Sequence, residues 1–363
     1  MLYLSIKYIN YITSFSKWKI SLSFFLAMVV LFFATPNFLI IQEHWEPILI
    51  QSKNPFIQHD YPPFSHASKL AFRFIPAIII GFFHLSVKGI IIWQYINGIF
   101  LFYLVGVVIE KISENKFIAF NTMMITCFIF TGKVSFINFK DTFDSLILCL
   151  ILLTFIYSNG ILLFLSIISI GFIDERGLVS TGFIFIFHLL FQKDKKIKLK
   201  TIIYIIGAWV CYFIIRIMLN KCYGLSTSTG GINFKTLALN LNFAPLAIWQ
   251  AFEGGWYIII LFLTALLRKS KLMCMITILH LCITVTIAFL VFDVTRSLVY
   301  TFPLLIIALK SLNEQRQNET FNRIVFQSML ICFLYPAYCA GGNQNYWNKP
   351  LPVKLLFEYF TNN

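Results

Sequence analysis

Long apolar runs separated by short polar stretches fill almost the whole chain. Because a transmembrane α-helix needs about 20 predominantly apolar residues, runs of this kind predict membrane spans. After a first run at 19–41, the apolar runs cover residues 72–86, 89–110, 117–133, 144–158, 159–173, 178–192, 201–219, 255–267, 272–291, 298–310 and 324–340. The pattern predicts an all-α, polytopic integral membrane protein.

Basic residues at the ends of the runs predict the orientation. Lys and Arg concentrate in cytoplasmic loops, and Lys7, Lys17 and Lys19 precede or open the first run. The N-terminus is therefore expected in the cytoplasm, with the loop after the first run outside. The strongest cytoplasmic marker is KDKKIKLK at 193–200. An odd number of crossings must separate that loop from this marker, yet six apolar runs lie between them, so one run does not cross.

The run at 72–86 is the one that we expect to stay outside. It is short, it begins beside Arg73, it contains Pro76, and it ends in His and Ser. These features favour a re-entrant or interfacial helix. The alternative is that residues 144–173 cross once rather than twice, with the Ser-Asn-Gly sequence at 158–160 inside a single span.

With 72–86 outside, the chain has about 11 transmembrane helices and outer-face interfacial helices. We treat residues 1–363 as a single transmembrane domain. Its outer parts are expected to be a loop and interfacial helix at 42–86, a loop at 220–254 and a C-terminal tail at 341–363.

The composition agrees with a membrane protein and argues against a nucleic acid partner. Apolar residues make up 59% of the 363 positions and charged residues 12%, whereas a soluble domain is about one quarter charged. The net charge of +14 would suggest a nucleic acid partner in a soluble protein. Here the Lys and Arg residues cluster at the ends of apolar runs, so the positive-inside rule explains the charge. We expect membrane lipids and no nucleic acid as partners.

Four charged clusters share the predicted outer face. Ionisable residues at membrane edges are costly unless they are paired or used in function. A helix cap at Asp144 and structural salt bridges in the last two clusters are the alternative explanations. The clusters are Glu43/Glu46/Asp60, Asp141/Asp144, Asp174/Glu175/Arg176 and Asp293/Arg296.

Arginines and carboxylates together suit a lipid substrate with an anionic head. A planar guanidinium binds phosphate oxygens in bidentate fashion. A carboxylate of the first loop can deprotonate an acceptor hydroxyl, or it can coordinate a divalent cation, Mg²⁺ or Mn²⁺. The candidate catalytic residues are Glu46, Asp60 and Glu43. The candidate substrate-binding residues are Arg73, His59, His66, Lys69, Asp141, Asp144, Asp174, Glu175, Arg176, Asp293 and Arg296.

Motifs of other chemistries do not occur in this sequence. It has no H-E-x-x-H, no Gly-rich phosphate loop, no nucleophile elbow and no C-x-x-C. Soluble nucleotide chemistry and metalloprotease chemistry are therefore disfavoured.

The layout resembles the GT-C superfamily of glycosyltransferases. The matching features are one span after a cytoplasmic N-terminus, an acid-bearing outer loop with interfacial helices, and Asp141 and Asp144 in a second outer loop where a span begins. YPPFSHASKLAFRFIPA, FIDERGLVS and FDVTRSL also look like segments of uncharacterised bacterial polytopic proteins of this layout. The resemblance implies a polyprenyl-phosphate-linked sugar donor outside the membrane and an acid of the first outer loop, here Glu43, Glu46 or Asp60, as catalytic base.

The sequence therefore predicts a glycosyltransferase in a bacterial inner membrane with a periplasmic active face. Its donor would be a sugar on undecaprenyl phosphate or diphosphate, and its acceptor a surface glycan or a lipid-linked molecule. One alternative is an O-antigen or capsule repeat-unit polymerase. Another is a flippase or other transporter of lipid-linked oligosaccharides, for which charges buried in mid-membrane would be expected.

Overall fold

The computed structural model describes residues 2–34, 45–58, 67–136, 143–157, 159–226, 234–291, 293–315, 318–334, 338–341 and 344–347. Nearly all of these residues are helical. The first half contains α1 (Leu2–Ser14), α2 (Trp18–Ala34), α3 (Glu46–Lys53), the 3₁₀ turn η2 (Ala67–Phe72), α4 (Phe74–Phe82), α5 (Val87–Ser113), α6 (Lys116–Phe128), α7 (Phe130–Lys133), α8 (Asp144–Ile156) and α9 (Gly160–Ile173).

The second half continues the helical bundle and ends in a small hairpin. It contains α10 (Glu175–Phe191), α11 (Lys195–Tyr223), α12 (Phe234–Leu241), α13 (Ala244–Phe252), α14 (Gly255–Lys269), α15 (Lys271–Phe289), α16 (Val294–Leu298), the 3₁₀ turn η4 (Val299–Thr301), α17 (Phe302–Gln315), α18 (Asn318–Leu334), β1 (Tyr338–Gly341) and β2 (Gln344–Trp347). Strands β1 and β2 pair antiparallel, with Tyr338 opposite Trp347.

Among the described residues, four helical segments are long and apolar enough to cross a membrane, or up to six if each of two sharply bent pairs forms one span. The described part of the chain is thus consistent with a multi-pass membrane protein. In the segment Val294–Gln315, which contains α16 and α17, 94% of an apolar stretch of 18 residues is buried. Only 22% of the corresponding stretch of α11 is buried. The segment that contains α16 and α17 therefore lies at the centre of the bundle, and α11 exposes an apolar face on the outside of the bundle.

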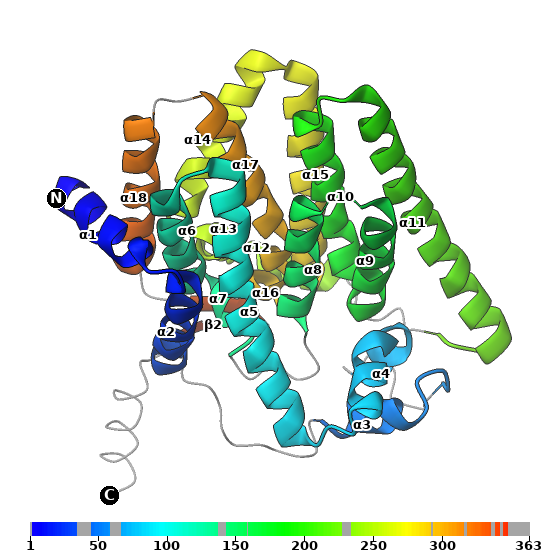
Figure 1. Cartoon of the computed structure of the whole chain (residues 1–363). Coiled ribbons are helices and arrows are strands. Elements are labelled where there is room, and N and C mark those ends of the chain that lie inside the picture. The colour runs from blue at the N-terminus through cyan, green and yellow to red at the C-terminus, as the bar shows by residue number, and fades with distance from the viewer. Residues whose placement is uncertain are drawn as a thin grey trace, which may run out of the picture.

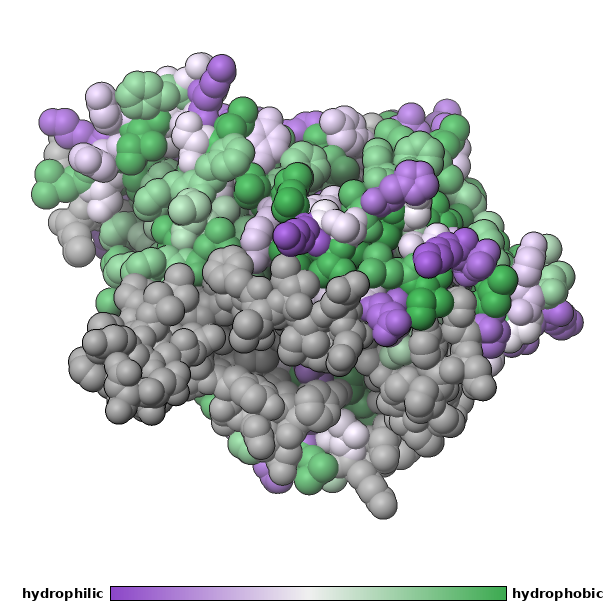
Figure 2. Space-filling model, turned by 90° about the horizontal axis from the view of Figure 1, so that it is seen from below, coloured by the Kyte–Doolittle hydropathy of each residue, from purple (hydrophilic) through white to green (hydrophobic). Residues whose placement is uncertain are grey.

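The connections between the helices lie at two ends of the bundle (Figure 1). At the upper end lie the connections between α5 and α6, between α10 and α11, and between α14 and α15. The last two connections carry the basic runs 193–200 and 268–271. The helices α3 and α4 lie at the opposite end, where α4 packs against α9. Seen from below, the described surface of that end mixes hydrophilic and hydrophobic residues (Figure 2).

The predicted non-crossing segment at 72–86 forms α4, only 9 residues long. It packs against α3, and the Gln51 side-chain amide donates a hydrogen bond to the Leu70 carbonyl at 2.6 Å. A Cβ on Gly81 would lie 2.5 Å from the Ser52 carbonyl oxygen, so the two helices touch through their backbones. α3, η2 and α4 thus form one packed unit that the long helix α5 joins to the bundle.

Several predicted boundaries were wrong. The run at 117–133 is broken, because α6 ends at Phe128 and α7 begins after Ile129. Residues 293–296 fall between the predicted runs 272–291 and 298–310, but Val294 to Arg296 are helical and buried. The last run was expected to extend to residue 340, but α18 ends at Leu334 and a short hairpin follows.

Gly98 allows the turn after α7 to approach α5. A Cβ at Gly98 would lie 2.6 Å from the Phe136 ring and 2.8 Å from the Ser135 Cβ. We expect Gly98→Ala to destabilise the protein by roughly 1–3 kcal/mol through overpacking, measured as a lower thermal unfolding midpoint in detergent. Gly207→Ala is the matched control, because its Cβ would meet only Phe164, at 3.8 Å. Equal unfolding midpoints for the two variants would contradict this packing argument.

Candidate functional site

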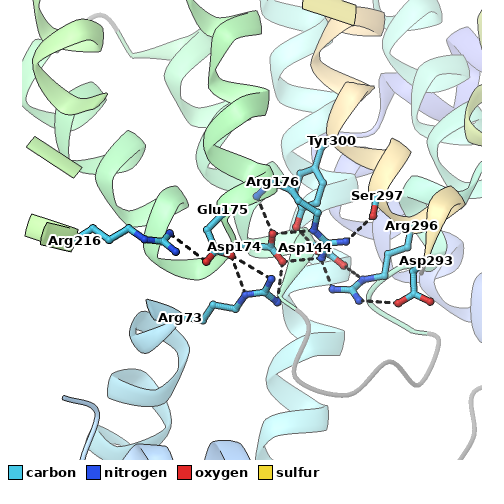
Figure 3. Close-up of polar contacts among 10 residues, drawn as sticks. All are labelled: Arg73, Asp144, Asp174, Glu175, Arg176, Arg216, Asp293, Arg296, Ser297 and Tyr300. Carbon is cyan, nitrogen blue, oxygen red and sulfur yellow. Dashed lines mark hydrogen bonds and ion pairs between the residues drawn. The ribbon is translucent and has the colours of Figure 1, made fainter. Parts of the chain in front are cut away.

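Charged side chains from α4, α8, α10, α11 and α16, or from the residues that cap these helices, meet in one network at the lower end of the bundle (Figure 3). We call it the arginine–carboxylate network. Its members are four arginines and four acids, Arg73, Arg176, Arg216, Arg296, Asp144, Asp174, Glu175 and Asp293, joined by Ser297 and Tyr300. Three of the four clusters predicted on one face therefore contribute to a single site, together with Arg73.

Asp174 lies at the centre of the first half of the network. It connects α9 to α10 and caps α10, because its Oδ1 accepts a hydrogen bond from the Arg176 backbone N–H at 2.9 Å. The Arg176 guanidinium donates to both oxygens of Asp174, at 2.9 and 2.7 Å. Arg73, the N-cap residue of α4, reaches Asp174 Oδ2 at 3.1 Å. One buried carboxylate thus ties α4 to the α9–α10 turn.

Glu175 extends this half toward the surface. It accepts from Arg73 Nε and Nη2, both at 3.3 Å, and from Arg216 Nη1 of α11 at 3.3 Å. Arg216 also donates to the Tyr212 hydroxyl at 2.7 Å, and its guanidinium lies 4.2 Å from the centroid of the Phe72 ring. The network therefore anchors α11 as well.

Asp144 is the centre of the second half. It is the first residue of α8, and its Oδ2 accepts from Arg296 Nε of α16 at 2.7 Å. The Tyr300 hydroxyl donates a short hydrogen bond to Asp144 Oδ1. Arg296 Nη1 also lies 3.4 Å from Asp293 Oδ2. This pairing explains Asp144 better than a helix cap does, since its side chain caps no backbone N–H of α8.

Arg176 joins the two halves. Its Nη1 donates to the Ser297 Oγ of α16 at 2.6 Å, and its guanidinium lies 5.4 Å from the centroid of the Tyr300 ring. A movement of α16 would therefore change the hydrogen bonds of both halves, through Ser297 in the first and Arg296 in the second.

The network is neutral overall because four guanidinium groups face four carboxylates. Burial alone would raise the pKa of the Asp174 carboxyl, but the charges of Arg176 and Arg73 outweigh burial and hold this pKa well below its usual range. Burial opposes the charged form of Arg73, yet Asp174 and Glu175 raise its pKa above the ordinary value. Both groups are therefore charged at neutral pH, and removing either would leave an uncompensated buried charge.

Exposure differs among the four acids. The side chains of Asp144 and Asp174 are 1% and 4% exposed, whereas those of Glu175 and Asp293 are 31% and 33% exposed. The two inner acids are thus held within the protein, and the two outer acids face accessible space. An anion that approaches the arginines would compete with the outer pair.

The remaining predicted residues lie elsewhere or outside the described part. Glu46 is exposed at the first position of α3, and no described interaction joins it to the network. Lys69 belongs to η2, but its side chain is not described. The predicted residues outside the described ranges are Glu43, His59, Asp60, His66 and Asp141.

Sequence reasoning missed three residues of the network, Arg216, Ser297 and Tyr300. Arg216 lies inside the apolar run 201–219, where a single ionisable residue is itself a signal for a buried partner. Tyr300 gave no such signal, because a tyrosine near a membrane edge is ordinary. Within the described ranges, no three His, Cys, Asp or Glu residues lie close enough to hold a metal ion. The cation role proposed for the first-loop carboxylates involves Glu43 and Asp60, outside those ranges.

Comparison with known proteins finds no matching family model, no matching curated protein and no matching solved structure.

Replacing Asp174 with Asn tests the charge balance separately from the helix cap. Asn caps helices about as well as Asp, so Asp174→Asn removes mainly the charge between Arg73 and Arg176. Breaking a buried pair in this way costs about 3–5 kcal/mol, and we expect a clearly lower thermal unfolding midpoint in detergent. Asp194, the exposed N-cap residue of α11, is the matched control. If Asp194→Asn lowered stability as much, the network would not be the cause.

Asp174 also predicts an acid limit to stability. Its folded pKa is depressed below the unfolded value of about 3.9. The stabilisation is therefore fully present above that value and is lost as pH falls toward the folded pKa. We expect the wild-type unfolding midpoint to be insensitive to this group between about pH 5 and pH 8 and to fall below about pH 4.

The pH profile of the Asp174→Asn variant should lack this part of the acid loss, so its midpoint should approach that of the wild type as pH falls. The Asp194→Asn profile should follow the wild type. A constant gap between the wild type and Asp174→Asn at every pH would contradict the prediction.

Proposed function

We propose that this protein is a membrane glycosyltransferase that acts at the outer face of a bacterial inner membrane. Its donor is a sugar on undecaprenyl phosphate or diphosphate, and its acceptor is a surface glycan or a lipid-linked molecule. The observation that carries the proposal is the arginine–carboxylate network, gathered at the end of the bundle opposite the basic connections. A site at lipid depth with arginines at its edge suits a substrate whose anionic head is attached to a lipid tail.

The positive-inside rule supports this orientation. The basic connections between α10 and α11 and between α14 and α15 lie at one end, and that end should face the cytoplasm. The N-terminal helix belongs to the same end, because the Lys116 ammonium at the start of α6 donates to the Thr13 carbonyl of α1 at 3.2 Å. The network and the α3–α4 unit then lie at the outer face.

The helix order supports about 11 crossings. Between the two ends run α2, α5, α6, α8, α9, α10, α11, α14, α15, α17 and α18, which alternate in direction along the chain. In this proposal, α3 and α4 stay on the outer side and do not cross. The shorter helices of 13–15 residues rise about 20–23 Å, so their ends must use flanking residues or local thinning of the bilayer to match its thickness.

The chemistry of the network suggests how an anionic head binds. Each arginine already has a carboxylate partner, so phosphate oxygens must replace one of them. Glu175 and Asp293 are the exposed partners, and moving either to solvent costs less than moving a buried acid. Arg73 and Arg296 would then keep their buried partners, Asp174 and Asp144, and receive phosphate on the outer side.

The transfer step needs a base beside this site. A carboxylate of the first outer loop, Glu43, Glu46 or Asp60, takes the proton of the acceptor hydroxyl. The hydroxyl oxygen forms the new bond to the anomeric carbon, while the bond from that carbon to the lipid phosphate oxygen breaks and its electron pair leaves with the phosphate. Configuration at the anomeric carbon inverts. The packing of α3 on α4, which begins next to Arg73, supports a location of Glu46 at this end.

One observation favours the transporter as a second candidate. Lys133 and Glu253 are buried at two helix breaks, and buried charges at broken helices are common in transport pathways. A transporter would move a lipid-linked oligosaccharide across proteoliposomes without changing its sugar composition. A transferase would change the mass of the acceptor by one sugar residue.

The first test of the proposal is the surface polysaccharide of a strain that lacks this gene. Loss of one sugar from an otherwise intact ladder would support a transferase that decorates the chain. A ladder collapsed to one repeat unit would point to the polymerase instead. An unchanged ladder and composition would overturn both enzyme assignments.

Complementation of that strain tests the catalytic base. A general base typically contributes about 10²–10⁴-fold to the rate, so one of Glu43→Gln, Glu46→Gln and Asp60→Asn should reduce transfer by about 100-fold or more. Glu319→Gln is the control, because Glu319 is exposed at the start of α18 and pairs with Arg323 at 3.8 Å. Full activity of all three first-loop variants at wild-type protein levels would contradict a base in this loop.

A further inference from the structure

Two helix breaks bring opposite charges into the interior of the bundle. Lys133 is the last residue of α7, the short helix that follows the break after α6, and it is 6% exposed. Glu253 lies at the 91° bend between α13 and α14 and is 1% exposed. Broken helices inside a membrane protein are tolerated where their free backbone and side chains line a polar site. Neither residue belongs to the arginine–carboxylate network.

The close approach of backbones shows that both breaks are built into the packing. A Cβ at Gly132 would lie 2.2 Å from the Thr126 carbonyl oxygen, and a Cβ at Gly254 would lie 2.2 Å from the Ser328 carbonyl oxygen. Only glycine fits such contacts. Glu253 itself adopts a positive φ of 47°, an uncommon conformation for a residue other than glycine. The sequence thus accepts local strain to keep this carboxylate at the bend.

The helix α7, which ends at Lys133, contacts α13, which precedes Glu253, yet no described ion pair within 4.0 Å joins Lys133 to Glu253. Glu253 Oε2 is buried and has no hydrogen-bond partner in the described part of the chain. The same is true of four uncharged polar atoms on neighbouring segments, Thr131 Oγ1, Ser135 Oγ, Gln250 Nε2 and Ser328 Oγ. An unsatisfied buried polar group is costly, so five such atoms beside two helix breaks suggest a site whose ligand would satisfy them.

This cluster adjoins the arginine–carboxylate network across a single short helix. α7 and α13 both contact α16. Thr295 of α16 donates to the Gln250 side chain at 3.5 Å, and the next residue, Arg296, belongs to the network. The two polar regions therefore lie on different sides of α16.

We propose that Lys133 and Glu253 form a second binding site, which takes the phosphorylated saccharide head of a second lipid-linked substrate. Lys133 supplies the cation for a phosphate, and the hydroxyl and amide groups around it donate further hydrogen bonds. Glu253 accepts a hydrogen bond from a sugar hydroxyl. The choice of ligand rests on the proposed function, which it sharpens, because a transferase with two such sites uses a lipid-linked acceptor as well as a lipid-linked donor.

The test counts bound lipids on the purified full-length protein by native mass spectrometry. The probe is undecaprenyl phosphate, and undecaprenol is the uncharged reference for nonspecific lipid. Wild-type protein should bind two undecaprenyl phosphates in excess of the undecaprenol count, and Lys133→Gln should bind one. Lys133→Arg, which keeps the charge, should restore the second. Lys310→Gln is the matched control, since Lys310 lies on α17 and contacts the Phe187 and Phe191 rings.

Glu253→Gln separates a binding role from a structural one. Removing a negative charge beside a phosphate should leave the second lipid bound or strengthen its binding, whereas a purely structural Lys133–Glu253 pair would predict the same loss for both variants. Two lipids on Lys133→Gln, a single lipid on the wild type, or equal losses in Lys133→Gln and Glu253→Gln would overturn the inference.

The lipid-binding experiment and the surface-polysaccharide experiment can fail independently of each other. A second lipid that depends on Lys133, together with an unchanged surface polysaccharide in the deletion strain, would keep the site and reject the transferase. A missing sugar branch in that strain, together with normal lipid binding by Lys133→Gln, would keep the transferase and reject the site.

Discussion

Four guanidinium groups held at one end of a helix bundle must be neutralised there, and much of the structure follows from this constraint. A charge removed from water costs several kcal/mol unless a partner compensates it. The compensating carboxylates come from separate parts of the chain, since Asp144 begins α8, Asp174 caps α10 and Asp293 precedes α16. The complete network forms only when α4, α8, α10, α11 and α16 are all in place. The network therefore helps to hold these helices together, in addition to being a candidate binding site.

The same neutrality restricts what the site can bind. Arginines without a carboxylate partner would bind anions with little selectivity. Paired arginines can bind an anion only if it displaces a carboxylate. The exchange is easier at Glu175 and Asp293, which are about one-third exposed. The inner pairs, Arg176–Asp174 and Arg296–Asp144, then keep the arginines in place during the exchange. This arrangement favours a ligand that offers several anionic oxygens, because it must compete with a bidentate carboxylate.

Charge counting along the sequence predicted the end of the bundle at which most of this network lies. The basic run 193–200 and the parity of the crossings placed Asp144, Asp174 and Arg296 on one face, and the structure brings them into one network. The pairing itself could not be predicted, because Arg296 meets Asp144 across 152 positions of the chain. Hydropathy also hid the helix break before Lys133, since a broken and a continuous apolar helix have the same composition. The break beside Glu253, by contrast, coincides with the predicted start of an apolar run at residue 255.

The position of α16 gives the two polar regions a physical connection. This short helix is buried on all sides, and its successive residues Thr295 and Arg296 point to different neighbours, Gln250 on one side and Asp144 on the other. Packed interiors transmit small displacements because they contain little free volume. An anion that draws Arg296 outward would therefore also move the wall of the Lys133–Glu253 cluster. For a reaction between two lipid-linked molecules, a shared wall of this kind would make occupation of one site depend on occupation of the other.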